Sequence, residues 1–311
     1  MAWEKLGRAF CPDGQSSWAR HSFMTPVPVD RGDGVLRIYG GMRDDEGISR
    51  IGWIDVAAED PLRVLAVSPD PVLDLGAPGM FDDNGVILGD VIRTGPTQLR
   101  MYYVGFQLVQ KAKFLAYTGL AVSDDNGGSF TRLQQTPVLD RAPQALFINA
   151  LHSIQKIDDG YRAWISCGQS WQQIGDRVFP QYNCWTLTSP DGIRFDMATA
   201  TPTLDCEGDE YRIGRPRANQ LPDGTYEMRV TSDTLSKRYA CFRAVSKDGV
   251  LWDRTDDDEL PRGEPGDWDG EMTCYPARID LSDGSSLLFY NGNNMGETGV
   301  GVARLVRGDD R

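Results

Sequence analysis

Four acidic residues stand at nearly the same distance before a sequence segment that recurs along the chain. Asp83, Glu210 and Glu271 each precede their copy of this segment by 16 residues, and Asp82 precedes its copy by 17. Because equal offsets in a repeat place residues at similar depths of the fold, we expect these carboxyl groups to lie around one opening. Cleavage of a glycosidic bond needs such groups: a carboxylic acid that protonates the leaving oxygen and a carboxylate that acts as base or nucleophile.

We expect Asp83 to be the general base or an electrostatic partner. Glu210 or Glu271 is expected to be the proton donor, with a pKa that neighbouring carboxylates raise. Asp82 is expected to contact the substrate. Alternatively, Asp82 or Asp83 caps a turn in the run Asp-Asp-Asn-Gly, as these residue types commonly do.

Histidine, arginine and aromatic side chains are the candidates for holding a substrate. His21 and His152, the two histidines of the chain, fall on predicted innermost strands, where an imidazole can bond a sugar hydroxyl or transfer a proton. Guanidinium groups in a strongly acidic chain favour recognition of a carboxylate or phosphate. The structural alternatives are histidines bonded to backbone, arginines paired with carboxylates and aromatics packed between sheets. The expected contacts are Arg20, His21, Asp82, His152, Trp171, Arg215 and Tyr275.

The elements that must position these residues are indicated by a repeat of about 63 residues. Its five copies begin at positions 36, 99, 161, 226 and 287, each with a short run of apolar and aromatic residues. β-branched and aromatic runs cut by Gly, Asp, Asn and Pro predict about four strands per period. Four strands in such a period are typical of a propeller blade. The sequence therefore predicts an all-β fold, a single five-bladed β-propeller spanning residues 1–311, rather than the alternative, a β-sandwich.

Local patterns give three further expectations. Asp-box-type turns at 123–130, 189–195 and 246–252 are expected to be structural. The segment 145–154 is predicted to be an innermost strand, although its apolar spacing also fits a helix. The fifth repeat ends at Leu305 after its third strand, so we expect the N-terminal strand around Trp3 to complete the last blade and cover its edge.

Charge excludes several partners. The chain has 32 Lys and Arg against 45 Asp and Glu, a net charge of −13. Such a balance repels phosphate backbones and anionic lipid, so nucleic-acid and membrane binding are not expected. The start of the chain is charged and no apolar stretch approaches a membrane span, which indicates a cytoplasmic protein whose six scattered cysteines are free thiols. The spacing of the histidines supports no metal site, and no cofactor is expected.

The repeat and three local stretches together resemble a known superfamily. The stretches are Pro78-Gly79-Met80-Phe81-Asp82-Asp83-Asn84-Gly85, Met101-Tyr102-Tyr103 and Trp268-Asp269-Gly270-Glu271-Met272-Thr273-Cys274-Tyr275-Pro276. They are similar to the glycosidase-type five-bladed propellers, which include furanosidases, arabinanases and mannoside phosphorylases. The resemblance implies a sugar pocket at one mouth of the central channel, built from the innermost strands. The N-D-P-N-G, R-D-P and E-C motifs of the retaining furanosidases are absent, and the nearest stretch, Asp205-Cys206-Glu207, has the wrong order.

The sequence thus predicts a carbohydrate-active enzyme, similar to glycoside hydrolases, whose substrate is a carbohydrate that could be anionic. Two alternatives remain open. One is a glycosyl-transferring or sugar-modifying enzyme that acts on a phosphorylated or nucleotide-activated sugar. The other is a sugar-binding propeller without catalysis. The oligomeric state is not predicted.

Overall fold

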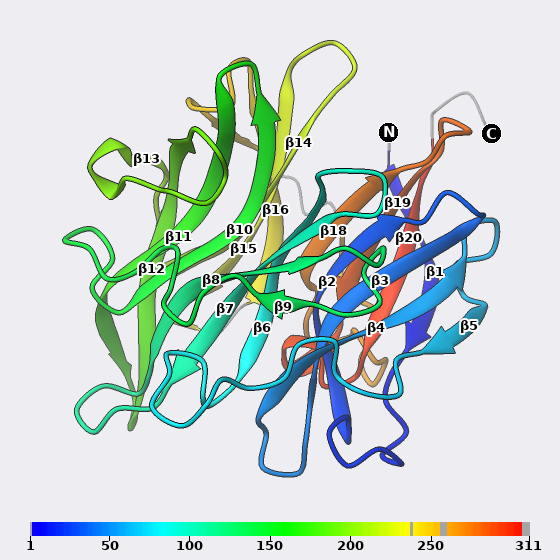
Figure 1. The fold of residues 1–311 in the computed structure, drawn as a ribbon, viewed down its shortest axis with the longest axis horizontal. Helices are drawn as coiled ribbons and strands as arrows, with labels where there is room; N and C mark the ends of the chain where they lie inside the picture. The colour runs from blue at the N-terminus through cyan, green and yellow to red at the C-terminus, as the bar shows by residue number, and fades with distance from the viewer. Residues whose placement is uncertain (1, 237–238, 256–259, 307–311) are drawn as a thin grey trace.

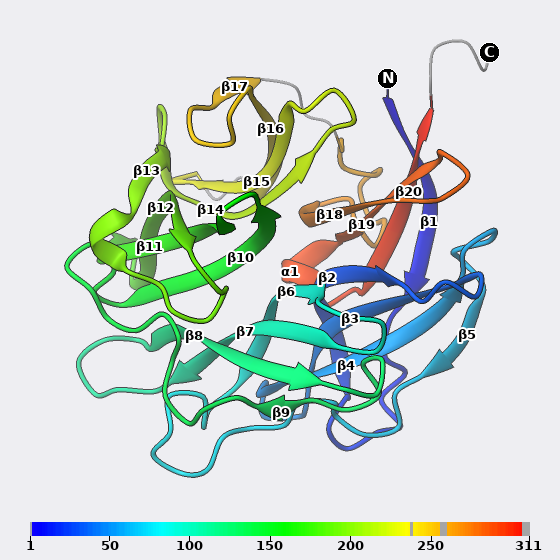
Figure 2. The same cartoon turned by 45° about the horizontal axis from the view of Figure 1, so that its top comes forward.

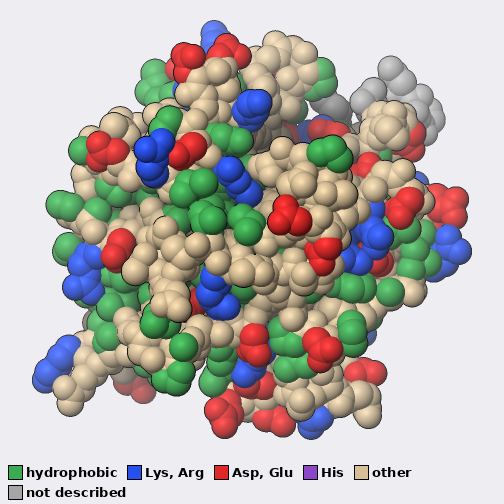
Figure 3. All heavy atoms as spheres, viewed as in Figure 1, with side chains coloured by type: hydrophobic (Ala, Val, Ile, Leu, Met, Phe, Trp, Pro, Cys, Tyr) green, Lys and Arg blue, Asp and Glu red, His purple; other side chains and the backbone are tan. Residues whose placement is uncertain are grey.

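Short strands and tight turns make up nearly all of the regular structure, which confirms the all-β prediction. The computed structural model describes residues 2–236, 239–255 and 260–306. Within these ranges the helical elements are a 3₁₀ turn at Met197–Thr199 and one short helix, α1 (Asn293–Gly296). None of the helices there has the length and apolar character that crossing a bilayer requires. On the face seen in Figure 3, acidic and basic side chains are interspersed.

The strands pair antiparallel in sets of four that follow the sequence repeat, and we call these sets units 1 to 5. Unit 1 holds β2 (His21–Asp30), β3 (Val35–Arg43), β4 (Ser49–Ala57) and β5 (Val64–Val67). Unit 2 holds β6 (Val86–Arg93), β7 (Leu99–Gln107), β8 (Leu115–Ser123) and β9 (Thr131–Arg132). Unit 3 holds β10 (Ile148–Ile157), β11 (Gly160–Ile174), β12 (Arg177–Ser189) and β13 (Thr201–Leu204). Unit 4 holds β14 (Glu210–Gln220), β15 (Tyr226–Thr234), β16 (Tyr239–Ser246) and β17 (Asp253–Thr255). Unit 5 holds β18 (Cys274–Asp280), β19 (Ser286–Asn291), β20 (Val300–Val306) and β1 (Ala2–Phe10).

Two features of this pairing test the sequence predictions. The N-terminal β1 pairs antiparallel with β20, from Ala2 opposite Val306 to Phe10 opposite Val300, which confirms that the N-terminal strand completes the last repeat. The segment predicted over 145–154 is a strand from Ile148 onward, where β10 begins. A parallel contact of two residue pairs between β10 and β8 joins units 2 and 3 into one eight-stranded sheet.

The first strands of the units surround a common centre. Strands β2, β6, β10, β14 and β18 contact one another in this order, and β18 contacts β2. Figure 2 shows these strands near the middle of the molecule, with β5, β9, β13, β17 and β1 at its outside, and Figure 1 shows the same fold from another direction. Buried apolar clusters fill the spaces between neighbouring units, as between units 1 and 2, where Tyr39 and Ile51 pack with Leu88 and Met101. The six cysteines are free.

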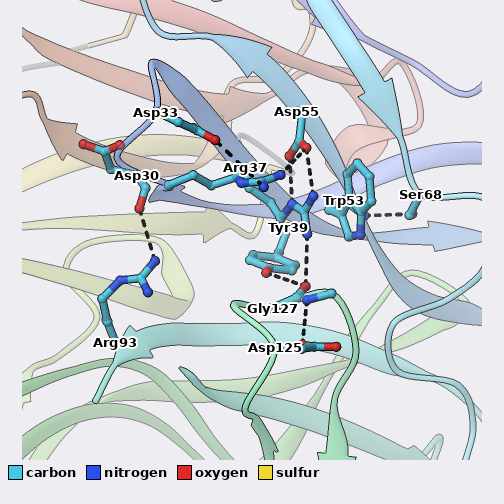
Figure 4. Close-up of polar contacts among 12 residues, drawn as sticks. Asp30, Asp33, Arg37, Tyr39, Trp53, Asp55, Ser68, Arg93, Asp125 and Gly127 are labelled. Atoms are coloured by element: carbon cyan, nitrogen blue, oxygen red, sulfur yellow. Dashed lines mark hydrogen bonds and ion pairs between the residues drawn. The ribbon is translucent and has the colours of Figure 1, made fainter. Parts of the chain in front are cut away.

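The repeated segment has a definite structural role in units 1 to 3, where it bonds the Asp-box turn of the next unit. In unit 1, Arg37 Nη1 (3.1 Å) and Tyr39 Oη (2.9 Å) donate to the Gly127 carbonyl in the Asp-box turn of unit 2, as Figure 4 shows. Asp125 accepts from the hydroxyls of Ser123 and Ser129 and from N–H groups of that turn, and these bonds outweigh burial and lower its pKa to about 2. The same clamp, a hydrogen bond from the repeated segment to a carbonyl of the next unit's Asp-box turn, recurs twice. Tyr102 Oη donates to the Gly192 carbonyl, and Trp164 Nε1 donates to the Gly249 carbonyl. The three turns are structural, as predicted.

Candidate functional site

The candidate site lies where the innermost strands begin. At this end of the ring the β11–β12 hairpin is unusually long: β10 begins opposite Gly168, and the hairpin continues beyond that point to its turn at 175–176. The start of β14 pairs with the end of β15, the start of β18 pairs with the end of β19, and the connection between β7 and β8 reaches the same end of the ring. Side chains from units 2 to 5 therefore meet here.

Arg215 on β14 occupies the centre of this arrangement. Its guanidinium crosses to β6, where Nη2 donates to the Leu88 carbonyl at 2.9 Å. The residue is only 7% exposed, and Nε and Nη1 have no hydrogen-bond partner among the described residues. Burial lowers the pKa of Arg215 to about 10, which still leaves it charged at neutral pH. A buried cation without a carboxylate is costly to the fold, so its presence points to a ligand.

The backbone that carries this side chain is distorted. Register shifts interrupt the pairing of β2, β14 and β18 with their neighbours, and at these bulges Ser22, Arg215 and Tyr275 have left-handed φ angles of 66°, 56° and 54°. Such conformations are costly for residues other than glycine and concentrate at binding and active sites. The bulges explain why a strand pattern read from the sequence cannot give the directions of these side chains.

Aromatic residues cover Arg215 from the side of units 4 and 5. Its guanidinium lies 5.0 Å from the centroid of the Tyr275 ring. The Tyr275 hydroxyl bonds the Tyr239 hydroxyl at 2.9 Å, and burial raises the pKa of both phenols. Tyr275 was predicted as a substrate contact, whereas Tyr239 had no signal in the sequence except its place near the end of a strand. Both hydroxyls could exchange hydrogen bonds with a sugar.

Arg217 and His152 belong to the wall behind Arg215. Arg217 Nη1 donates to Asp90 Oδ1 (2.8 Å) and to the carbonyls of His152 (2.7 Å) and Gly89 (3.1 Å), which fastens β14 to β6 and β10. His152 is 5% exposed and its Nδ1 has no partner among the described residues. Burial, with the positive charges of Arg215 and Arg217, holds the pKa of His152 well below 6.5. The imidazole is therefore neutral at physiological pH.

The depressed pKa of His152 predicts a loss of stability in mild acid. Below pH 6.5 the unfolded chain binds a proton at this residue and the folded chain does not, so the free energy of unfolding falls as the pH falls. At pH 5.5, one unit below the pKa of 6.5 in the unfolded chain, we expect His152 to lower the free energy of unfolding by about 1.4 kcal/mol. Denaturant unfolding at pH 7.5 and 5.5 should show this drop in the wild type and a correspondingly smaller one in His152→Asn. Equal drops in the two proteins would contradict the assignment.

The predicted proton donors, Glu210 and Glu271, have surroundings that differ from those expected. Both oxygens of Glu210 accept from Arg254, at 2.8 and 2.6 Å. Burial alone would raise the pKa of Glu210, but its hydrogen bonds and the charge of Arg254 outweigh burial and lower the pKa. The predicted rise in this pKa is therefore wrong for Glu210, because its neighbour is a cation rather than another carboxylate. Glu271 is exposed, and its backbone N–H donates to Asn293 Oδ1.

The neighbouring pair of aspartates is held by local structure. Asp82 is buried and forms an ion pair of 2.7 Å with Arg132 on the outermost strand of its own unit. Asp83 Oδ2 accepts the Gly79 N–H at 2.8 Å, the turn-capping arrangement that the sequence offers as the alternative. Among the described residues, no hydrogen bond joins any two of these four carboxyl groups, and three of them are held by other partners.

The remaining predicted contacts, Arg20, His21 and Trp171, each have a partner of their own. Arg20 pairs with the exposed Asp45 at 3.1 Å. His21 Nδ1 is 2.8 Å from the Ser22 hydroxyl. Trp171 on the long hairpin packs edge-on against Phe114 and Phe147. Of the residues named from the sequence, the structure thus brings together Arg215, Tyr275 and His152. No group of three or more His, Cys, Asp or Glu residues within the described ranges is arranged to hold a metal ion.

Comparison with known proteins gives two relatives over the whole length and a shared fold. No family model matches the chain. Two Mycobacterium tuberculosis proteins, the uncharacterized proteins MT1551 (strain CDC 1551) and Rv1502 (strain H37Rv), are each 32% identical over 310 residues, 98% of this chain and 99% of theirs. Among solved structures, a glycoside hydrolase matches with a TM-score of 0.76 and 17% identity, covering 99% of this chain and 94% of that chain. The β-1,2-mannobiose phosphorylase from Listeria innocua matches with a TM-score of 0.67 and 14% identity, covering 92% and 89%. These structures share the fold.

Proposed function

This chain belongs to the same family as the Mycobacterium tuberculosis proteins MT1551 and Rv1502, and we propose that it is a carbohydrate-active enzyme that binds an anionic sugar at the mouth of a central channel. The fold we propose is a five-bladed propeller in one domain, with β1 closing unit 5. Glycoside hydrolases and a mannoside phosphorylase share this architecture, which supports a carbohydrate as the substrate.

One observation carries the proposal: a buried guanidinium with two unpartnered nitrogen atoms. Arg215 has no carboxylate partner among the described residues, although acidic residues outnumber basic ones in the chain. A phosphate or carboxylate on the sugar supplies the missing charge and acceptors, and such bonds are about twice as strong as neutral ones. Tyr275 lies beside the guanidinium and its hydroxyl, paired with that of Tyr239, can bond the sugar hydroxyls. The neutral imidazole of His152 adds a further polar group to the wall.

This site favours transfer or modification of a phosphorylated or nucleotide-activated sugar over simple hydrolysis. Hydrolysis by paired carboxylates needs one carboxyl group with a raised pKa beside a second, free one. Glu210 has a lowered pKa in a bidentate ion pair, Asp83 caps a turn, and the side chain of Glu271 is exposed. Hydrolysis of a glycoside stays the second candidate, favoured by the fold that the chain shares with glycoside hydrolases.

Replacement of Arg215 by Gln tests the proposal. We expect the thermal midpoint of the wild type to rise with sugar phosphates or nucleotide sugars and not with neutral monosaccharides, because a ligand that binds only the folded state stabilises it. Arg215→Gln should bind the anionic ligand about a hundredfold more weakly, since a charged hydrogen bond contributes roughly 1.5–3 kcal/mol. Without ligand the variant should be as stable as the wild type or more so, because it no longer buries an unpaired charge.

A matched arginine at the opposite end of the ring serves as the control. Arg63, which is exposed and pairs with Glu59, should be replaceable by Gln with no change in ligand response. If neutral sugars raised the thermal midpoint equally in the wild type and in Arg215→Gln, this result would contradict an anionic substrate. It would favour hydrolysis of a glycoside instead. A variant that simply loses stability without ligand would indicate a structural arginine.

A further inference from the structure

A hollow of about 490 Å³ opens beside the long hairpin, apart from the Arg215 centre. It lies between the connection from β7 to β8, which supplies Lys111 and Lys113, and the hairpin, which supplies Trp171, Arg177 and Val178. Three cations therefore border one small space in a chain of net charge −13. Such local concentration of one sign attracts an oppositely charged ligand, most strongly at low ionic strength.

These cations lack the partners that a structural role would supply. Within the described ranges, Lys111, Lys113 and Arg177 form no ion pair with a carboxylate. Lys113 and Arg177 both line the hollow, and burial, with the positive charges of Arg177 and Arg212, lowers the pKa of Lys113. The indole Nε1 of Trp171 is also buried and has no hydrogen-bond partner among the described residues. An anion in the hollow would relieve the repulsion and could accept this N–H.

A continuous series of aromatic rings and cations connects the hollow to Arg215. The Phe179 ring has Arg177 at 5.4 Å, Arg212 at 5.9 Å and Lys113 at 6.0 Å from its centroid. Arg212, paired with Asp233 at 2.6 Å, lies 5.4 Å from the Tyr239 ring. Tyr239 bonds Tyr275, which lies against Arg215. The hollow and Arg215 are thus linked by one set of contacts, with positive charge at both ends and aromatic rings between them.

We propose that the hollow beside the hairpin is a second anion-binding subsite, so that the substrate is a sugar linked to a diphosphate. This inference extends the proposed function, which assigns the anionic sugar to Arg215. Lys113 and Arg177 bind the diphosphate from opposite walls of the hollow, Lys111 adds charge at its edge, and the anionic sugar reaches Arg215 beyond the aromatic rings. The group beyond the diphosphate is a nucleoside or a lipid, since both sources share this chemistry.

Titration of the full chain with inorganic pyrophosphate, uridine diphosphate and farnesyl diphosphate tests the subsite. We expect wild type to bind pyrophosphate saturably and Lys113→Ala or Arg177→Ala to weaken this binding at least tenfold, with the double variant showing none. Tighter binding of uridine diphosphate identifies a nucleotide source, and tighter binding of farnesyl diphosphate a lipid source. Lys156→Ala is the matched control, because Lys156 is exposed at the other end of β10, opposite Tyr161, and should bind like wild type.

The outcomes separate this inference from the proposed function. If Lys113→Ala and Arg177→Ala bind all three probes as wild type does while Arg215→Gln loses its sugar-phosphate response, the subsite is wrong and the Arg215 site stands. If the hairpin variants lose binding while Arg215→Gln responds like wild type, the subsite stands and the central site is wrong. Absence of pyrophosphate binding by the wild type would also overturn the subsite. Lys113 and Arg177 are both exposed, so we expect the two variants to fold like wild type. Unchanged thermal midpoints check this expectation.

Discussion

Removal of residues 2–10 is expected to abolish cooperative folding of the whole chain. Without β1, the backbone of β20 loses its partner from Val300 to Val306 and becomes an open edge. The deletion also removes Leu6 from the apolar cluster of units 1 and 5, the Lys5–Asp269 ion pair of 2.7 Å, and the contact of the Trp3 ring with Arg229 at 5.2 Å. Because β18 contacts β2, damage to unit 5 also opens the ring.

Circular dichroism during heating measures this effect, with a loss of the sharp transition as the expected result. A synthetic peptide of residues 1–10 supplies the missing strand from outside, so it should restore the transition, whereas a scrambled peptide of the same composition should not. A truncated chain that melts sharply near the wild-type midpoint would show that β1 covers an edge without closing the fold.

Most of the fold could be predicted from the sequence, because the same repeat indicates both the strands and the turns that follow them. The spacing of the segments at Leu36, Leu99 and Tyr161 gives the period, and the Asp-box turns mark the hairpins between outer strands. The structure adds that Tyr39, Tyr102 and Trp164 are the groups that bond these turns. The sequence could not show that β8 and β10 would pair, because that parallel contact is only two residue pairs long.

The site was harder to predict, because it depends on ion pairs between residues far apart in the sequence. Glu210 has the right position in the repeat, but Arg254, which lies 44 residues later, occupies both of its carboxylate oxygens. Arg215 was identified by its residue type and place near the start of a strand, whereas its unpartnered state could be seen only in three dimensions. Lys113 and Arg177 gave no sequence signal, since they come from two separate connections that the ring brings together.

Replacement of Trp164 by Ala is expected to lower the free energy of unfolding by roughly 4 kcal/mol. The side chain is fully buried on β11, packs against Tyr226 and Trp252, and donates Nε1–H to the Gly249 carbonyl of the next unit at 3.0 Å. Denaturant unfolding followed by fluorescence or circular dichroism measures the change. Trp164→Phe separates the two contributions: it keeps most of the apolar volume and removes the hydrogen bond, so it should cost about 1–3 kcal/mol. If Trp164→Phe proved as damaging as Trp164→Ala, the bond to the Asp-box turn would dominate; if both were neutral, the clamp between units 3 and 4 would have no part in stability.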